Sequence, residues 1–134
     1  RIVHTHRRPS EVVGSIASLQ WHLYQTFSDF NDLRELGNQV CRRWSEAHHE
    51  FMHLLEESAA LRERTFTLEY SAFVDNPLEQ ISALYDHFGL TLGDTEATNM
   101  RNYLSQRPQH RFGKHSYELE DYGLNDRQVN DAFA

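Results

Sequence analysis

The stretch that decides the fold is residues 2–15, Ile-Val-His-Thr-His-Arg-Arg-Pro-Ser-Glu-Val-Val-Gly-Ser. Its first five residues are short, β-branched and extended, which predicts a buried strand. Pro9 ends this strand, because the residue before a proline is driven out of the α region. Ser10 is the expected N-cap of a helix, and Glu11 suits the positive end of its dipole. The stretch therefore predicts a strand, a tight turn and a helix from about residue 11 to about residue 27.

The rest of the chain predicts more helix and one further strand. Residues 65–70 alternate in polarity and form the second predicted strand. Gly37 is the expected point at which a long helical segment divides, since glycine weakens a helix interior. Pro77 starts a helix that Gly89 ends. Apolar spacing predicts the helical segments 33–64, 77–88, 94–104 and 125–133. Strands separated by helices are typical of a parallel α/β sheet, although two strands are too few to complete one.

Length and composition describe a globular protein. The chain has 134 residues, 39% of them hydrophobic and 12% aromatic, which is enough for one domain with a core of its own. A net charge of −7 argues against a protein that covers nucleic-acid phosphates. No apolar run is long enough to span a membrane, and the first residues show no signal-peptide pattern. The single cysteine, Cys41, favours a reducing compartment, so we expect a soluble, cytoplasmic protein.

The turn after the first strand is a candidate anion site. Arg7 lies at the carboxyl end of the strand, and its guanidinium offers forked donors to an anion. The helix that follows would present backbone N–H groups without partners, and Ser15 lies one turn into it. The alternative is a surface arginine beside an ordinary helix start.

The same run resembles the 3′-phosphate-binding segment of sulfotransferases. In that family a strand leads into an arginine, a turn with a proline, and a serine eight positions after the arginine. The resemblance implies that Arg7 and Ser15 hold the 3′-phosphate of the sulfate donor 3′-phosphoadenosine 5′-phosphosulfate (PAPS). Many relatives have an aspartate in place of Arg8, which leaves the role of Arg8 open.

Two later stretches resemble the same family, in the family's order. Residues 68–78 are similar to its strand-end motif, in which Tyr70 matches a tyrosine that often lies near the adenine. Ser71 and Ala72 replace the usual acidic pair there. Residues 114–124 resemble the tail of the bacterial-type branch. Cytosolic relatives bind the 3′-phosphate with a basic, glycine-containing segment near the carboxyl end, and the similar residues here are Arg111, Gly113 and Lys114; a solvated basic loop is the alternative.

The resemblance implies an α/β fragment of the P-loop-NTPase-like sulfotransferase fold. Residues 1–134 would be the carboxyl-terminal part of one such domain, because the chain opens within a strand and has no initiator methionine. The upstream half, with the phosphosulfate loop and the catalytic base, would be its missing partner. The implied reaction moves a sulfuryl group from PAPS to a hydroxyl or amine of a small-molecule, glycan or lipid acceptor, without a metal. This chain would supply no catalytic residue and would be inactive alone.

Two other functions are compatible with the sequence. One is a non-catalytic nucleotide-binding or interaction module with the same fold. The other is a zinc peptidase, because His49-Glu50-Phe51-Met52-His53 is an HExxH motif on a predicted helix. No third ligand follows at a familiar spacing, although Glu69 is a conceivable one. Solvated positions on a long helix are the favoured interpretation of His49, Glu50 and His53.

Overall fold

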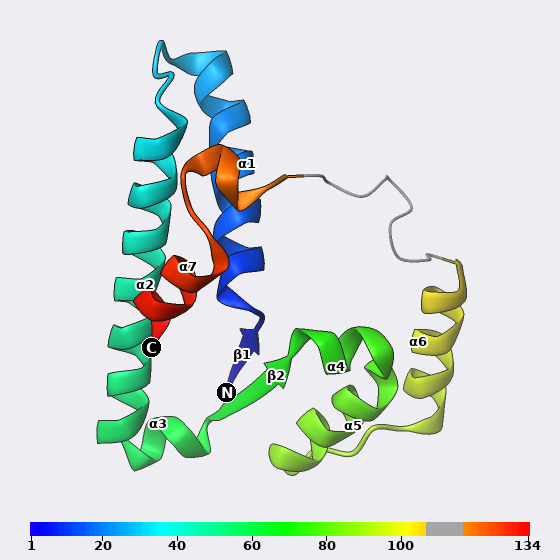
Figure 1. Cartoon of the computed structure of the whole chain (residues 1–134). Coiled ribbons are helices and arrows are strands. Elements are labelled where there is room, and N and C mark those ends of the chain that lie inside the picture. The colour runs from blue at the N-terminus through cyan, green and yellow to red at the C-terminus, as the bar shows by residue number, and fades with distance from the viewer. Residues whose placement is uncertain (107–116) are drawn as a thin grey trace. The chain divides into compact units, whose positions relative to one another are not determined.

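A computed structural model describes residues 1–106 and 117–134 (Figure 1). The chain divides into two compact units, which are described separately. The strand unit comprises Arg1–Arg7 and Ser58–His115, and the helical unit comprises Arg8–Glu57 and Ser116–Ala134. In chain order the elements are β1 (Ile2–His6), α1 (Pro9–Phe27), α2 (Leu33–Glu57), α3 (Ala59–Glu63), β2 (Thr65–Glu69), α4 (Tyr70–Asp75), α5 (Pro77–His87), α6 (Asp94–Gln106), the 3₁₀ helix η1 (Leu119–Tyr122) and α7 (Asp126–Phe133).

The strand unit is built on β1 and β2, which pair in parallel from Ile2 opposite Thr65 to His6 opposite Glu69. Both predicted strands are therefore confirmed, as is their parallel direction. The prediction that the second strand reaches Tyr70 is wrong by one residue, because Tyr70 begins α4.

Helix α5 begins and ends as its sequence predicts. Pro77 occupies the first turn, where its missing N–H costs no hydrogen bond. Gly89 has a φ of +63°, the left-handed conformation that glycine adopts at the end of a helix. The Gly89 N–H donates to the carbonyl of Asp86 at 3.0 Å, and the Leu90 N–H donates to the carbonyl of Tyr85 at 2.8 Å. These two bonds form a Schellman motif, which satisfies carbonyl groups that the helix end leaves open.

The helical unit contains the hydrophobic core. Helices α1 and α2 pack on each other, and η1 and α7 pack against both. Leu36, Val13 and Val129 are completely buried. The buried cluster consists of Val13, Ala17, Leu36, Val40, Cys41, Tyr122, Leu124 and Val129. Cys41 is thus a core residue, and burial raises the pKa of its thiol.

Two local predictions in this part of the chain are wrong. Ser10 is not the N-cap of α1: the helix begins at Pro9, whose fixed φ suits a first helical position, and Arg8 is the cap residue. Gly37 does not divide the long helical segment, because it is buried within α2. A Cβ added at Gly37 would meet the carbonyl oxygen of Tyr122 and would lie 2.8 Å from its Cβ, so glycine permits close packing here. The division comes at Ser58, whose hydroxyl accepts the N–H of Leu61 at 3.2 Å and caps α3.

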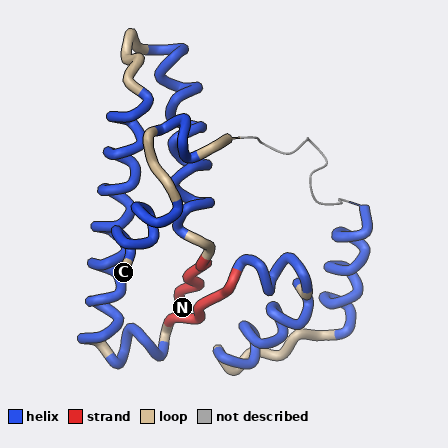
Figure 2. The backbone as a smooth tube through the Cα atoms, in the orientation of Figure 1, coloured by secondary structure: helices blue, strands red, loops and turns tan. Residues whose placement is uncertain are grey.

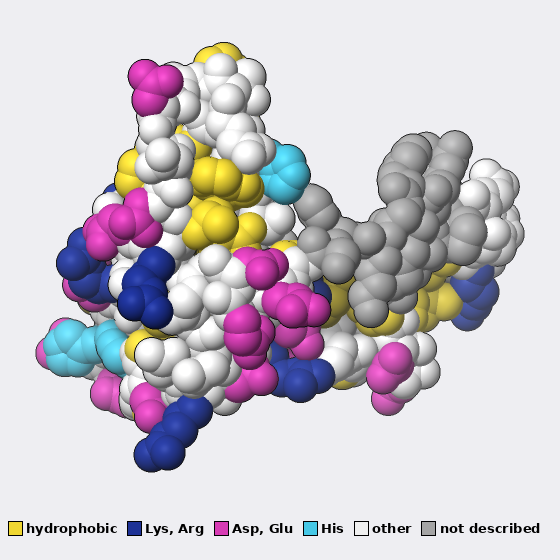
Figure 3. Space-filling model, turned by 45° about the horizontal axis from the view of Figure 1, so that its top comes forward, with side chains coloured by type: hydrophobic (Ala, Val, Ile, Leu, Met, Phe, Trp, Pro, Cys, Tyr) yellow, Lys and Arg dark blue, Asp and Glu magenta, His cyan; other side chains and the backbone are white. Residues whose placement is uncertain are grey.

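Large hydrophobic side chains also reach the outer surface of the helical unit (Figure 3). On α1, Leu19, Leu23 and Phe27 are 58%, 51% and 82% exposed. On α2, Trp44 is 44% exposed. Within residues 1–106 and 117–134, no helix combines the length and the apolar character needed to cross a membrane.

Candidate anion-binding site

The candidate site begins where the two parallel strands end. Parallel pairing brings the carboxyl ends of β1 and β2 to the same edge, so the residues that follow the strands are neighbours. His6 and Glu69 are the last pair, with 3.5 Å between Nε2 of His6 and Oε1 of Glu69. The chain passes from β2 into α4 without a loop, and a short loop follows β1 (Figure 2). Arg7 and Tyr70 are the first residues beyond the two strands.

Arg7 and Tyr70 contact each other. The guanidinium carbon of Arg7 lies over the phenol ring of Tyr70, 4.7 Å from the ring centroid. This is the geometry of a cation–π contact, in which the positive charge meets the negative face of the ring. The N–H groups of a guanidinium lie in its own plane, so a ring that covers one face leaves these donors directed sideways. The structure therefore brings together two predicted site residues, both in the strand unit.

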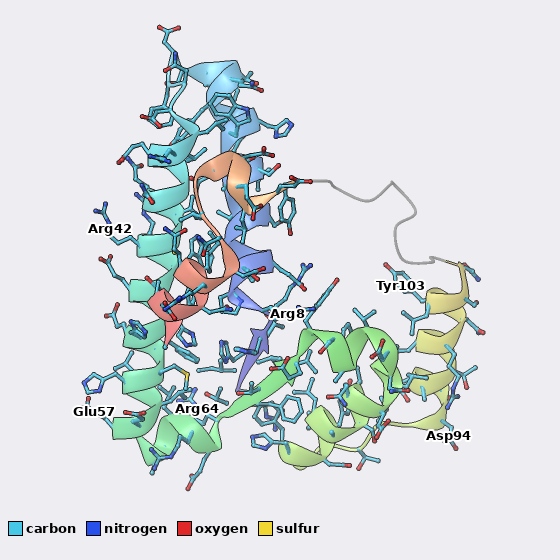
Figure 4. All side chains as sticks on the ribbon, in the orientation of Figure 1. Arg8, Arg42, Glu57, Arg64, Asp94 and Tyr103 are labelled. Carbon is cyan, nitrogen blue, oxygen red and sulfur yellow. The ribbon has the colours of Figure 1, made fainter. Side chains whose placement is uncertain are left out.

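The start of α1 offers fewer donors than the sequence predicts. Pro9 has no N–H, and the N–H groups of Glu11 and Val12 donate to the carbonyl of Arg8 at 3.1 and 3.2 Å. The Arg8 side chain is 82% exposed, and its Nε lies 3.3 Å from Oε1 of Glu11. Figure 4 shows Arg8 at the base of α1. The prediction that the first N–H groups of this helix have no partners is wrong for Glu11 and Val12.

Ser15 is half-buried on α1, in the helical unit. Its neighbour Gly14 is buried beneath Tyr117: a Cβ added at Gly14 would lie 2.5 Å from Cε2 of that ring. The Tyr117 hydroxyl donates to the carbonyl of Glu11 at 2.9 Å. Tyr117 thus holds the first turns of α1, a role that the sequence did not reveal. The tyrosine within residues 114–124 and the glycine within residues 2–15 are the sequence signals that could have indicated it.

The remaining predicted site residues are not placed. Arg111, Gly113 and Lys114 lie outside the described residues. Arg7 and Tyr70 belong to the strand unit and Ser15 to the helical unit, so the structure describes their surroundings separately. The assignment of these residues to one phosphate therefore rests on the sequence motif.

The HExxH motif lies on α2, and its side chains point to solvent. His49, Glu50 and His53 are all exposed. Nε2 of His53 lies 3.5 Å from Oε1 of Glu57, one turn further along the helix. Among the described residues, no three histidine, cysteine, aspartate or glutamate side chains are grouped as metal ligands would be. The exposure of these three residues agrees with the interpretation of the motif as part of a solvated helix face.

Solved structures of sulfotransferases share this fold. Sulfotransferase STF9 from Mycobacterium avium superimposes with a TM-score of 0.85 over 99% of this chain, at 22% sequence identity. Sulfotransferase STF1 from Mycobacterium tuberculosis H37Rv superimposes with a TM-score of 0.77 over 98% of this chain, at 28% identity. This chain spans 34% and 32% of the lengths of those two proteins. The architecture is therefore an α/β fragment of the sulfotransferase fold, as the sequence predicted.

The sequence comparison gives the family as well as the fold. The model of the Sulfotransferase family matches residues 1–94, which include β1, β2 and the candidate site at their ends. The chain belongs to the sulfotransferase family. No curated protein matches it significantly.

Proposed function

We propose that this chain is the donor-binding part of an enzyme that transfers a sulfuryl group from PAPS to a hydroxyl or amine. Membership of the sulfotransferase family supports the class of reaction. The observation that carries the choice of donor is Arg7, a cation at the carboxyl end of β1 whose guanidinium is stacked on Tyr70. In open α/β sheets, ligands bind at the carboxyl ends of the strands, so Arg7 lies where an anionic ligand is expected.

Arg7 and Ser15 are the proposed ligands of the 3′-phosphate. The guanidinium supplies charge-assisted hydrogen bonds to phosphate oxygens, and the Ser15 hydroxyl supplies a weaker neutral one. Arg111, Gly113 and Lys114 are proposed to add basic and backbone donors to the same nucleotide. The chain carries a net charge of −7, so these local groups must attract the nucleotide against the overall field.

In the proposed reaction, the acceptor oxygen or nitrogen forms a bond to sulfur while the bond between sulfur and the 5′-phosphate oxygen breaks. The nucleotide leaves as 3′-phosphoadenosine 5′-phosphate (PAP), and the proton of the acceptor goes to a base that lies outside this chain. The residues described here contribute by holding the nucleotide in a fixed orientation, which lowers the entropic part of the barrier. The acceptor is proposed to be a small molecule, a glycan or a lipid, and the single cysteine favours a cytoplasmic enzyme.

Binding of two nucleotides to the full-length protein tests this proposal. PAP and adenosine 5′-phosphate (AMP) differ only in the 3′-phosphate, so calorimetric titration with both isolates the contribution of that group. We expect PAP to bind at least about tenfold more tightly than AMP, as one or more charge-assisted hydrogen bonds provide. Equal affinity for the two nucleotides would contradict the proposed donor.

A further inference from the structure

The contact between Arg7 and Tyr70 defines a role for Tyr70 that differs from contact with the adenine. We infer that Tyr70 is a positioning residue: its ring supports the guanidinium of Arg7 and fixes the plane in which that group meets the 3′-phosphate. The inference rests on the proposed function, because it assigns the phosphate to Arg7. The evidence is the position of the guanidinium carbon over the ring, 4.7 Å from the centroid.

The backbone holds Tyr70 more firmly than it holds the end of the Arg7 side chain. Tyr70 directly follows β2 and is the first residue of α4, so its backbone conformation is constrained on both sides. Its ring is set by only two side-chain torsions, whereas arginine has four and loses much rotamer freedom when its end group is fixed. A ring in a fixed place therefore lowers the number of orientations that the guanidinium samples before the phosphate arrives.

Stacking suits this task because the ring meets the face of the guanidinium, whereas the N–H groups of that group lie in its plane. The in-plane N–H groups of a guanidinium are the ones that form a forked contact with phosphate. An aromatic ring instead occupies the face of the group. The Tyr70 side chain is 37% exposed, so this support stands at the surface of the strand unit, where a ligand can reach the arginine.

A supporting ring and an adenine-binding ring have different consequences for affinity. If Tyr70 acts through Arg7, its loss weakens only ligands that carry the 3′-phosphate. If the ring contacts the base, its loss weakens every adenine nucleotide. The two roles also predict different coupling between substitutions at Tyr70 and at Arg7. If Tyr70 acts through Arg7, its loss has no further effect on affinity once Arg7 is absent.

The test is calorimetric titration of the full-length protein with PAP and AMP, using Tyr70→Leu, Tyr70→Phe, Arg7→Ala and the double variant Arg7→Ala/Tyr70→Leu. Tyr70→Leu removes the ring and is expected to weaken PAP binding about two- to fivefold, the size of an exposed cation–π contact, while AMP binding stays the same. Tyr70→Phe keeps the ring and is expected to bind PAP as the natural protein does. Tyr103→Leu, an exposed tyrosine on α6 of the same unit, is the matched control and should change neither affinity.

The coupling between the two substitutions, measured with the double variant, gives the second readout. The double variant is expected to bind PAP no more weakly than Arg7→Ala alone. Additive losses, or equal weakening of PAP and AMP by Tyr70→Leu, would overturn the positioning role and assign the ring to the base. If Tyr70→Leu does not fold, as judged by circular dichroism, Tyr70→Met carries the same prediction. A natural protein without preference for PAP over AMP would instead contradict the proposed function, so the two failures are distinguishable.

Discussion

The two units of the chain differ in what they contain. In the described residues, every member of the buried core cluster belongs to the helical unit, whereas Leu68 is the buried hydrophobic residue of the strand unit. The strand unit instead holds polar and aromatic side chains at the ends of its strands, among them Arg7 and Tyr70. The comparison indicates that stability and ligand chemistry rest on different residues. Substitutions should therefore separate the free energy of unfolding from nucleotide affinity.

The largest expected effect is on stability, in the helical unit. Leu36 is completely buried, and Leu36→Ala removes most of a core side chain and leaves a cavity. The expected loss in the free energy of unfolding is about 2–5 kcal/mol. Denaturant unfolding of the full-length protein, followed by circular dichroism, measures it. Leu54→Ala on the same helix is the control, because Leu54 is 47% exposed and its truncation should change stability little. Equal losses for the two variants would contradict the placement of Leu36 in the core and of Leu54 at the surface.

A smaller effect on stability is expected when substitutions at Gly37 and Gly89 are compared. Gly37→Ala places a methyl group against the backbone of Tyr122, and overpacking of this kind costs about 1–3 kcal/mol. A Cβ added at Gly89 meets no atom within 4 Å, and asparagine tolerates the left-handed conformation, so we expect Gly89→Asn to cost less than about 1 kcal/mol. Thermal unfolding of both variants gives the comparison. A Gly89→Asn variant that is less stable than Gly37→Ala would contradict the close packing of α2 on Tyr122.

The smallest effect concerns Ser15. Its hydroxyl is proposed to make a neutral hydrogen bond to the 3′-phosphate, and such bonds contribute about 0.5–1.5 kcal/mol. Ser15→Ala should therefore weaken PAP binding by roughly two- to tenfold, with AMP binding unchanged. Ser105→Ala on α6, an exposed serine of the strand unit, is the matched control. Unchanged PAP affinity in Ser15→Ala would contradict the proposed contact between Ser15 and the 3′-phosphate, and it would leave the proposed role of Arg7 unaffected.

Local signals in the sequence were sufficient for much of the fold. The β-branched run before Pro9 predicted β1, and Pro77 and Gly89 marked the ends of α5, because proline and glycine act through their own backbone conformations. Asn125 is the first residue of the predicted segment 125–133, and it caps α7 by accepting the N–H of Gln128 at 2.9 Å. Each of these features depends on residues that are close in the chain.

The failed prediction at Gly37 depends on a contact between distant residues, whereas those at Ser10 and Tyr70 are boundary shifts of one or two residues. Gly37 is buried because Tyr122 packs on it, and no pattern near Gly37 reports that contact. On α1, Leu19, Leu23 and Phe27 are exposed, whereas Val13 and the small residues Gly14, Ala17 and Ser18 are buried. Hydrophobic periodicity is read mainly from large apolar side chains. It therefore does not identify a helix face on which small residues let a neighbouring element pack closely.

The candidate site was predicted in part. The motif identified Arg7 and Tyr70 separately, but their contact follows from the parallel register of β1 and β2, which the sequence does not specify. Tyr117 was not recognised as a support for the start of α1, because its hydroxyl bonds to the backbone of Glu11 far away in the chain. The anionic ligand therefore stays a prediction from side-chain identity, and the fold supplied the contact between Arg7 and Tyr70.

The central claim is that Arg7 binds the 3′-phosphate of the sulfate donor, and calorimetric titration of Arg7→Ala in the full-length protein tests it most directly. A charge-assisted contact contributes about 1.5–3 kcal/mol, so PAP affinity should fall roughly tenfold to a hundredfold. AMP affinity should remain the same, because AMP lacks the group that Arg7 contacts. Arg101→Ala, an exposed arginine on α6, provides the control and should leave both affinities unchanged. Equal weakening of PAP and AMP by Arg7→Ala, or no weakening of PAP, would contradict the claim.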